Sequence, residues 1–174
     1  MLRYIFLSVF ALLVLTACGN KDLDQFKQSG FTDCDKCDLS GVDLSGTDLS
    51  NAKLFKVQFV GADLTGANLT NVNMQMANLR EANLTGANLS GATLFSSHFT
   101  RANLSGANLV GANLGYASLQ EANLAGANLT EAYLGNTHLA GANLTGADLT
   151  NVDYGSKLPP YTPTKTRYPR NYGR

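Results

Sequence analysis

A period of five residues governs most of this chain. From Leu39 to Tyr154 every fifth residue is large and apolar, and no insertion breaks the register. Two residues before each of these positions the side chain is small, with Ala in most units and Cys, Val, Thr or Ser in the rest. A period of five matches neither the helical period of 3.6 nor the strand period of 2. Each unit is therefore expected to be a short extended piece followed by a corner, with both slots facing a confined interior.

The repeated unit, A-(D/N)-L-x-x, resembles the pentapeptide-repeat family from Cys37 to about Tyr154. The resemblance implies an all-β fold, a right-handed quadrilateral β-helix in which four units make one coil. The 24 units from Leu39 to Tyr154 then make about six coils, stacked at the strand spacing of about 4.8 Å. We predict this solenoid over residues 34–154.

The N-terminus reads as a lipoprotein signal peptide over residues 1–17. Arg3 precedes an apolar run that is shorter than the roughly 20 residues a spanning helix needs. The residues before Cys18, Leu-Thr-Ala, resemble the bacterial lipobox, which implies that Cys18 is lipidated and opens the mature protein. Because Gly19 is not Asp, we expect anchoring to the outer membrane, facing the periplasm, in a Gram-negative host. In another host we expect the extracytoplasmic face of the cell membrane.

Two flanking segments complete the predicted organisation. Residues 18–33 form a lipid-anchored linker and a cap, in which Lys21–Gln28 is expected to be a short helix that covers the first coil with Leu23 and Phe26. Residues 155–174 are rich in Pro, Tyr and basic side chains and contain no acid, so we expect a disordered tail. A basic tether for an anionic surface is the functional alternative for this tail.

Residues 20 apart should stack in columns if four units make a coil. Columns of Asn with acidic ends, such as the one from Asp43 to Asn143, are expected to hydrogen-bond along the rod. The Gly column from Gly46 to Gly146 indicates a corner that needs positive φ. Alternating charges at Glu81, Arg101 and Glu121 predict a ladder of ion pairs.

One side of the predicted rod departs from these ladders. Its corner carries the large apolar residues Phe55, Met76, Phe95 and Tyr116 at outward positions, and the adjoining side carries His98 and His138. Contiguous exposed apolar surface often marks an interaction site, so these six residues are the candidate contact surface. The alternative is that these are isolated exposed apolar residues without a function, which are common on protein surfaces. The two histidines should lie about 10 Å apart, too far to share a metal ion, and we assign no metal site.

Cys34 and Cys37 have the C-x-x-C spacing of redox and zinc motifs, yet both fall in inward slots of the repeat. They would be the first and last residues of a four-residue corner, whose Cα atoms lie within about 7 Å. A structural disulfide and two packed thiols both fit this placement. A reactive dithiol fits less well, because redox cysteines are exposed.

The sequence contains no catalytic constellation, phosphate loop or metal-ligand cluster, so we expect no enzyme activity and no cofactor. The favoured function is that of a rigid envelope lipoprotein that contacts a protein or the cell wall, with a second copy as a further candidate partner and no nucleic acid. The resemblance to the pentapeptide-repeat family implies a second candidate, a gyrase-protecting DNA mimic, which the lipobox and the neutral Asn columns disfavour. Residues 38–154 carry nine acids and four bases, a net charge of −5 that is sparse for a duplex mimic. A periplasmic thiol redox protein is the third hypothesis.

Overall fold

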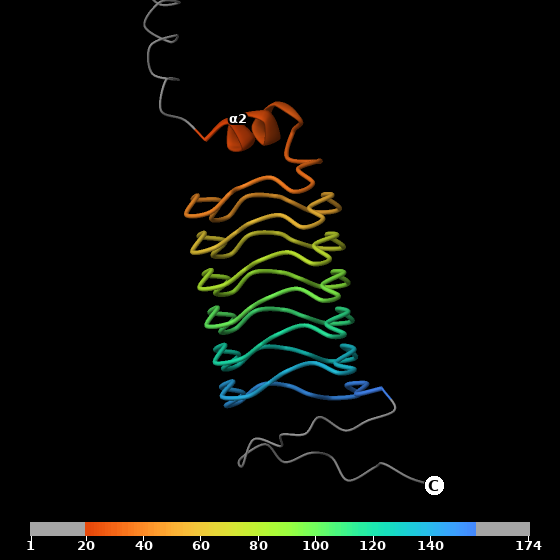
Figure 1. The fold of residues 1–174 in the computed structure, drawn as a ribbon. Coiled ribbons are helices and arrows are strands. Elements are labelled where there is room, and N and C mark those ends of the chain that lie inside the picture. Colours follow the sequence, from red (N-terminus) through yellow and green to blue (C-terminus); the bar gives the residue numbers. More distant parts are fainter. Residues whose placement is uncertain (1–19, 156–174) are drawn as a thin grey trace, which may run out of the picture.

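The computed structural model describes residues 20–155, and within this range the chain winds into a straight rod. Each parallel bridge joins a residue to the one 20 positions later, for example Asp63 to Asn83. One column, from Asp33 to Asp153, holds six such bridges in succession. The stacked coils, and the helix that lies at one end of the described chain, are visible in Figure 1. The predicted signal peptide, the predicted lipidation site Cys18 and the predicted basic tail lie outside the described residues.

The rod has four faces, each defined by a column of inward residues 20 apart. Face 1 runs from Cys34 to Tyr154, face 2 from Leu39 to Leu139, face 3 from Leu44 to Leu144, and face 4 from Leu49 to Leu149. In the central coils both slots of the repeat are buried, as at Leu84 and Ala82 with 0% exposure. The period of five therefore encodes an interior of stacked Leu and Ala, as the sequence predicts.

Backbone hydrogen bonds between coils explain why one residue per unit suffices for a bridge. Asn83 N donates to Ala62 O in the coil before it (2.9 Å), and its carbonyl accepts from Leu64 N (2.7 Å). A third bond closes each corner within the chain, such as that from Ala67 N to Leu64 O (3.0 Å). Within residues 20–155 the sides of the coils are single bridges and not longer strands.

All four corners have positive φ at the second residue after the inward one. The Gly column predicted to need this conformation has it, with φ of 63° at Gly46 and 71° at Gly146. The requirement is broader than the sequence analysis proposed, because Arg101 (φ 61°) and Tyr116 (φ 58°) adopt it as well. A left-handed conformation costs an L-residue about 1–2 kcal/mol. The packing and hydrogen bonds of the surrounding coils must offset this cost at each such residue.

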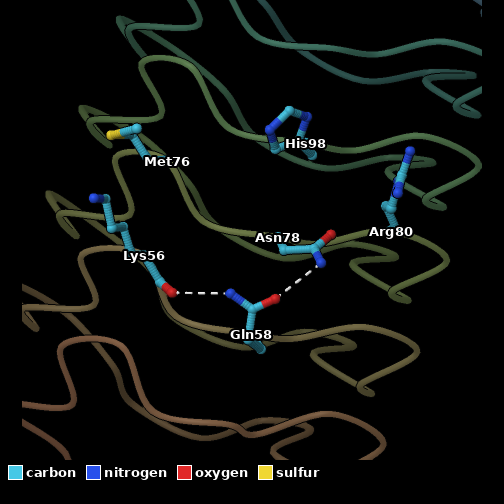
Figure 2. A pocket seen from close by; sticks show the side chains of 6 residues that line it. All are labelled: Lys56, Gln58, Met76, Asn78, Arg80 and His98. Atoms are coloured by element: carbon cyan, nitrogen blue, oxygen red, sulfur yellow. Dashed lines mark hydrogen bonds between the residues drawn. The ribbon is translucent and has the colours of Figure 1, made fainter.

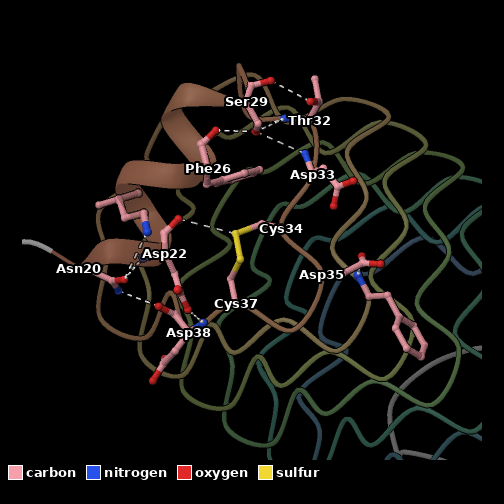
Figure 3. Close-up of a disulfide and its surroundings, with 12 residues drawn as sticks. Asn20, Asp22, Phe26, Ser29, Thr32, Asp33, Cys34, Asp35, Cys37 and Asp38 are labelled. Atoms are coloured by element: carbon pink, nitrogen blue, oxygen red, sulfur yellow. Dashed lines mark hydrogen bonds between the residues drawn. A yellow bond between two sulfur atoms is a disulfide. The ribbon is translucent and has the colours of Figure 1, made fainter.

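Helix α2 (Lys21–Gln28) covers the first coil and occupies the segment where the sequence predicts a cap. The Asn20 side chain accepts from Asp22 N (3.0 Å) and Leu23 N (3.2 Å), which satisfies two free donors of the first turn. Phe26 is fully buried beneath the helix, and its ring meets the edge of Phe31 at 5.2 Å. The Asp22 carboxylate accepts from Asp38 N (2.7 Å), so the helix also caps an exposed donor of the solenoid (Figure 3).

Cys34 and Cys37 form a disulfide across the first corner, with their Cα atoms 5.3 Å apart. The bond lies under α2, close to Asp22 (Figure 3). Cys34 is 3% exposed and belongs to the core. The sequence allows either a structural disulfide or two packed thiols here, and the structure has the disulfide.

The opposite end of the rod is more open. Tyr154 fills the last inward position of face 1 and is 5% exposed, whereas Ala142, Ala147 and Leu149 are only partly buried. The described chain ends at Gly155, beside Tyr133 and Gly135. Across residues 20–155, no helix is long and apolar enough to span a membrane.

Candidate functional site

The outward columns of faces 3 and 4 hydrogen-bond along the rod, although not as the simple amide ladder that the sequence predicts. Asn123 Nδ2 donates directly to Asn103 Oδ1 one coil below (3.1 Å). Elsewhere a threonine hydroxyl takes the place of the amide oxygen, as where Asn103 Nδ2 donates to Thr85 Oγ1 (2.8 Å). The difference follows the residue two positions after the lower Asn: where it is a threonine, such as Thr85, its hydroxyl donates to Asn83 Oδ1 (2.7 Å) and accepts from the amide above. In both kinds of pair the lower amide oxygen also accepts the backbone N–H two residues later, as in an Asx turn. These columns consist of satisfied polar groups and offer no free site.

The acidic ends of the same columns are stabilised as carboxylates by these turn bonds. The backbone N–H of Ser45 and then its hydroxyl lower the pKa of Asp43, and Ser50 does the same for Asp48. The Thr150 hydroxyl and backbone N–H lower the pKa of Asp148. Each of these carboxylates accepts hydrogen bonds from the residue two positions later in its own turn.

The expected ion-pair ladder at the corner between faces 2 and 3 is reduced to one pair. Arg101 Nε lies 2.9 Å from Glu121 Oε2, and both side chains are mostly exposed. Glu81 forms no ion pair with any described residue, so the predicted alternation of three charges is wrong in extent. Free rotation of exposed side chains explains this, because such pairs contribute little energy.

The corner between faces 1 and 2 exposes a ridge of apolar side chains. Met76 is 47% exposed, Phe95 37% and Tyr116 54%, and within residues 20–155 these are the exposed large apolar residues. The rings of Phe95 and Tyr116 lie 5.3 Å apart, so neighbouring coils form a continuous surface. Phe55 is partly buried and lies under the Lys56 ammonium, 5.1 Å from the ring centre.

This corner differs from the other three because it has no glycine at its positive-φ position. Among those positions, Lys56, Met76 and Tyr116 have φ between 57° and 58°. Large side chains are uncommon in this conformation, which Arg101 and Glu121 adopt at another corner as well. The apolar ridge is therefore kept against a local conformational cost.

Tyr133 extends the ridge by one coil, which the sequence analysis missed. A Cβ atom on Gly115 would lie 2.8 Å from the Tyr133 ring and 3.2 Å from Phe95, and a Cβ on Gly135 would overlap the same tyrosine. The two glycines thus make room for the ring. In the sequence, two glycines at a corner otherwise built from large residues, near a tyrosine in the neighbouring outward column, were the signal that could have revealed this packing. We call Met76, Phe95, Tyr116 and Tyr133 the ridge.

A shallow groove of about 400 Å³ lies beside the ridge on face 2 (Figure 2). Its lining residues are Lys56, Gln58, Met76, Asn78, Arg80 and His98. Gln58 donates to Lys56 O (3.1 Å) and accepts from Asn78 Nδ2 (2.9 Å). The outward column of face 2, where the sequence predicts a broken ladder, therefore keeps one amide–amide bond, between Gln58 and Asn78.

The break comes at His98, which stands one coil above Asn78. The Asn78 Oδ1 atom is buried and has no hydrogen-bond partner, the one such side-chain atom in the described part of the chain. In the columns of faces 3 and 4 an amide one coil above donates to this position. The His98 side chain is exposed and makes no such bond. A buried acceptor in the lining of the groove thus has no donor.

His138, the second histidine of the candidate surface, is exposed and lies two coils above His98 with Ser118 between them. It does not line the groove. No group of three His, Cys, Asp or Glu side chains that could hold a metal ion occurs in residues 20–155.

Comparison with known proteins identifies the repeat. A family model described as Pentapeptide repeats matches residues 32–153 in overlapping segments, with 8 copies. No curated protein matches the chain. Solved structures similar to it include a pentapeptide repeat protein from the Arabidopsis thaliana thylakoid lumen, with 31% identity over 72% of this chain and 70% of that one, and a TM-score of 0.36.

Two further similar structures have lower identity. Rfr23 from the cyanobacterium Cyanothece 51142 is 26% identical over 78% of this chain and 98% of its own, with a TM-score of 0.39. QnrB1, a plasmid-mediated fluoroquinolone resistance protein, is 24% identical over 73% of this chain and 77% of its own, with a TM-score of 0.38. The family match rests on the repeats themselves, because these superpositions all have TM-scores below 0.5.

Proposed function

Because the chain belongs to the pentapeptide-repeat family, we propose that it is a non-enzymatic lipoprotein of the bacterial cell envelope. In this proposal a right-handed rod of about six coils is anchored through lipid on Cys18 and meets a protein or cell-wall partner along the ridge. The observation that carries it is the ridge itself. Exposed apolar side chains are gathered on one corner, where two of them occupy strained backbone positions.

The position of the anchor suits such a presentation. Cys18 lies two residues before Asn20, the cap of α2, and α2 covers the first coil. A lipid there would hold the capped end of the rod nearest the membrane. The ridge would then extend away from the membrane, coil by coil, from Met76 to Tyr133. In a Gram-negative host the expected location is the periplasmic side of the outer membrane.

The two alternative functions receive less support from the described residues. A DNA mimic needs regularly spaced carboxylates, whereas the outward columns are mostly Asn and Thr that bond to one another. A thiol redox role needs an accessible, reactive cysteine, whereas Cys34 is buried under α2.

Crosslinking in intact cells, followed by mass spectrometry, tests the ridge. The wild type is compared with a Phe95→Asp, Tyr116→Asp double variant. The matched control is a Gln120→Asp, Ala140→Asp variant, which places the same two charges on exposed positions of another corner. We expect the partners to disappear with the ridge variant and to remain with the control. The same partners in all three samples would refute the contact surface.

The anchor is tested separately. Cys18→Ser should release the protein from the membrane fraction, because lipidation requires the cysteine thiol. Continued membrane fractionation of this variant would show that the protein is attached in another way.

A further inference from the structure

We propose that the groove on face 2 binds the carboxyl terminus of a peptide. The inference rests on the proposed function, since it gives a chemistry to the partner that meets the ridge. The ligand would place its terminal carboxylate near Arg80, its last backbone N–H at Asn78 Oδ1, and an apolar side chain on Met76. Three independent features of the groove lead to this chemistry.

The first feature is charge. The rod from residue 38 to 154 has nine acids and only four bases. Arg101 is paired with Glu121, whereas Arg80 and Lys56 line the groove and form no ion pair within residues 20–155. Half of the basic side chains of an acidic rod therefore face one small depression, and no carboxylate lines it. Unpaired cations around a concave site favour an anionic ligand.

The second feature is the unpartnered acceptor at Asn78 Oδ1, in the lining of the groove. A buried carbonyl oxygen without a donor destabilises the protein, so a ligand that displaces the side chains around this atom and donates to it gains affinity. An ionised carboxylate only accepts hydrogen bonds, and cannot satisfy this atom. The ligand must therefore carry a donor close to its negative charge. The carboxyl terminus of a peptide has both, because the N–H and the carboxylate of the last residue share one Cα.

The third feature is the arrangement of the lining residues. Figure 2 shows Asn78 between Arg80 on one side and Met76 and Lys56 on the other, with the Asn78 carbonyl on the side of Arg80. The exposed Met76 side chain joins the groove to the ridge. A volume of about 400 Å³ is at the lower end of the range for ligand sites and suits two or three residues. A chain could thus pass from Arg80 across Asn78 and leave over the apolar corner.

The test uses the full chain in detergent and follows its side-chain amide and backbone signals by NMR. The probes are N-acetyl-Ala-Ala-Leu with a free carboxylate, the same peptide with a terminal amide, and acetate. We expect the free acid to shift the Asn78 and Met76 signals and to bind at least about tenfold more tightly than the amide or acetate. Equal binding of acid and amide would refute the carboxylate contact. Equally tight binding of acetate would reduce the groove to a simple anion site and overturn the proposal.

Two variants locate the interaction. Arg80→Gln should weaken binding at least about tenfold, whereas Arg101→Gln, one coil away and outside the groove, should leave it unchanged. His98→Asn restores the amide that donates to this position in the other columns. It should raise the melting temperature and weaken peptide binding, because Asn78 Oδ1 then has a partner within the protein. A His98→Asn protein with higher stability and unchanged affinity would refute the role of Asn78.

The chemistry of a peptide carboxyl terminus can come from a protein or from the peptide of the cell wall. An N-acetylated tripeptide ending in D-Ala-D-Ala, compared with its all-L counterpart, separates these sources, since the tighter binder identifies the handedness of the natural ligand. Loss of crosslinks in the ridge variant together with no peptide binding would refute this inference and leave the proposed function standing. If the peptide binds but the crosslinks are unaffected by the ridge variant, the ridge is refuted as the contact surface and the peptide site stands.

Discussion

The disulfide at the first corner should stabilise the capped end of the rod and leave the rest unaffected. Cys34 and Cys37 are separated by three positions, so the bond closes a loop of about four residues. The chain-entropy relation for a loop of this length gives a stabilisation of about 2 kcal/mol. In a solenoid each coil contacts only its neighbours, so this free energy is expected to act on the opening of α2 and the first coil.

Hydrogen exchange measured by mass spectrometry, with and without reductant, tests this reasoning. A loss of about 2 kcal/mol raises the open population of the first coil about 30-fold, and exchange of the amides from Asp22 to Leu49 should accelerate by up to that factor. Amides between Leu84 and Leu124 should exchange at unchanged rates. A Cys34→Ala, Cys37→Ala variant should behave like the reduced protein, with a small additional loss from the missing buried sulfur.

Two results would contradict this account. Uniform acceleration along the whole rod would mean that the coils unfold as one cooperative unit. Retained exchange protection together with loss of the partner contacts would point to the thiols as functional groups, and so to the redox alternative.

Three further predictions concern the solenoid. Leu84→Ala, at a fully buried central position, should lower the free energy of unfolding by about 3 kcal/mol, whereas Leu144→Ala in the last coil should cost less because that end is more open, as chemical denaturation would show. Gly106→Ala should cost about 1 kcal/mol by the same assay, since the new Cβ meets no atom within 4 Å but must adopt a φ of 65°. The melting temperature should fall below about pH 4, because Asp43 and Asp48 have lowered pKa values in the folded state and stabilise it only while they are ionised.

These predictions have clear contrary outcomes. Equal costs at Leu84 and Leu144 would show that the open end is covered in solution. A neutral Gly106→Ala would show that the corner relaxes to negative φ. For the acids, the sign follows from the lowered pKa: the stabilisation is complete above the unfolded-state pKa of about 4 and is lost as pH falls through the folded-state value. A melting temperature that stays constant from pH 6 to pH 3 would contradict it.

The ridge was predictable in part. Its members Met76, Phe95 and Tyr116 could be found from the period alone, because the spacing of 20 places outward residues in columns. Tyr133 could not be placed in the ridge by that rule, since its outward position belongs to face 1. Its ring reaches the corner only because Gly115 and Gly135 leave space there, and that is a matter of side-chain packing across coils.

By itself the sequence determined the interior of the solenoid and the family to which it belongs. The period of five assigns every residue an inward, outward or corner position, and burial of Leu and Ala enforces that register. Only the tertiary structure decided the groove, the unpartnered acceptor at Asn78 and the reduction of the charge ladder to one pair. These depend on contacts between side chains 20 residues apart, whose rotamers and partners are free to vary while the register stays fixed. The interior is encoded by the repeat, and the surface by its exceptions, such as His98 above the amides Gln58 and Asn78.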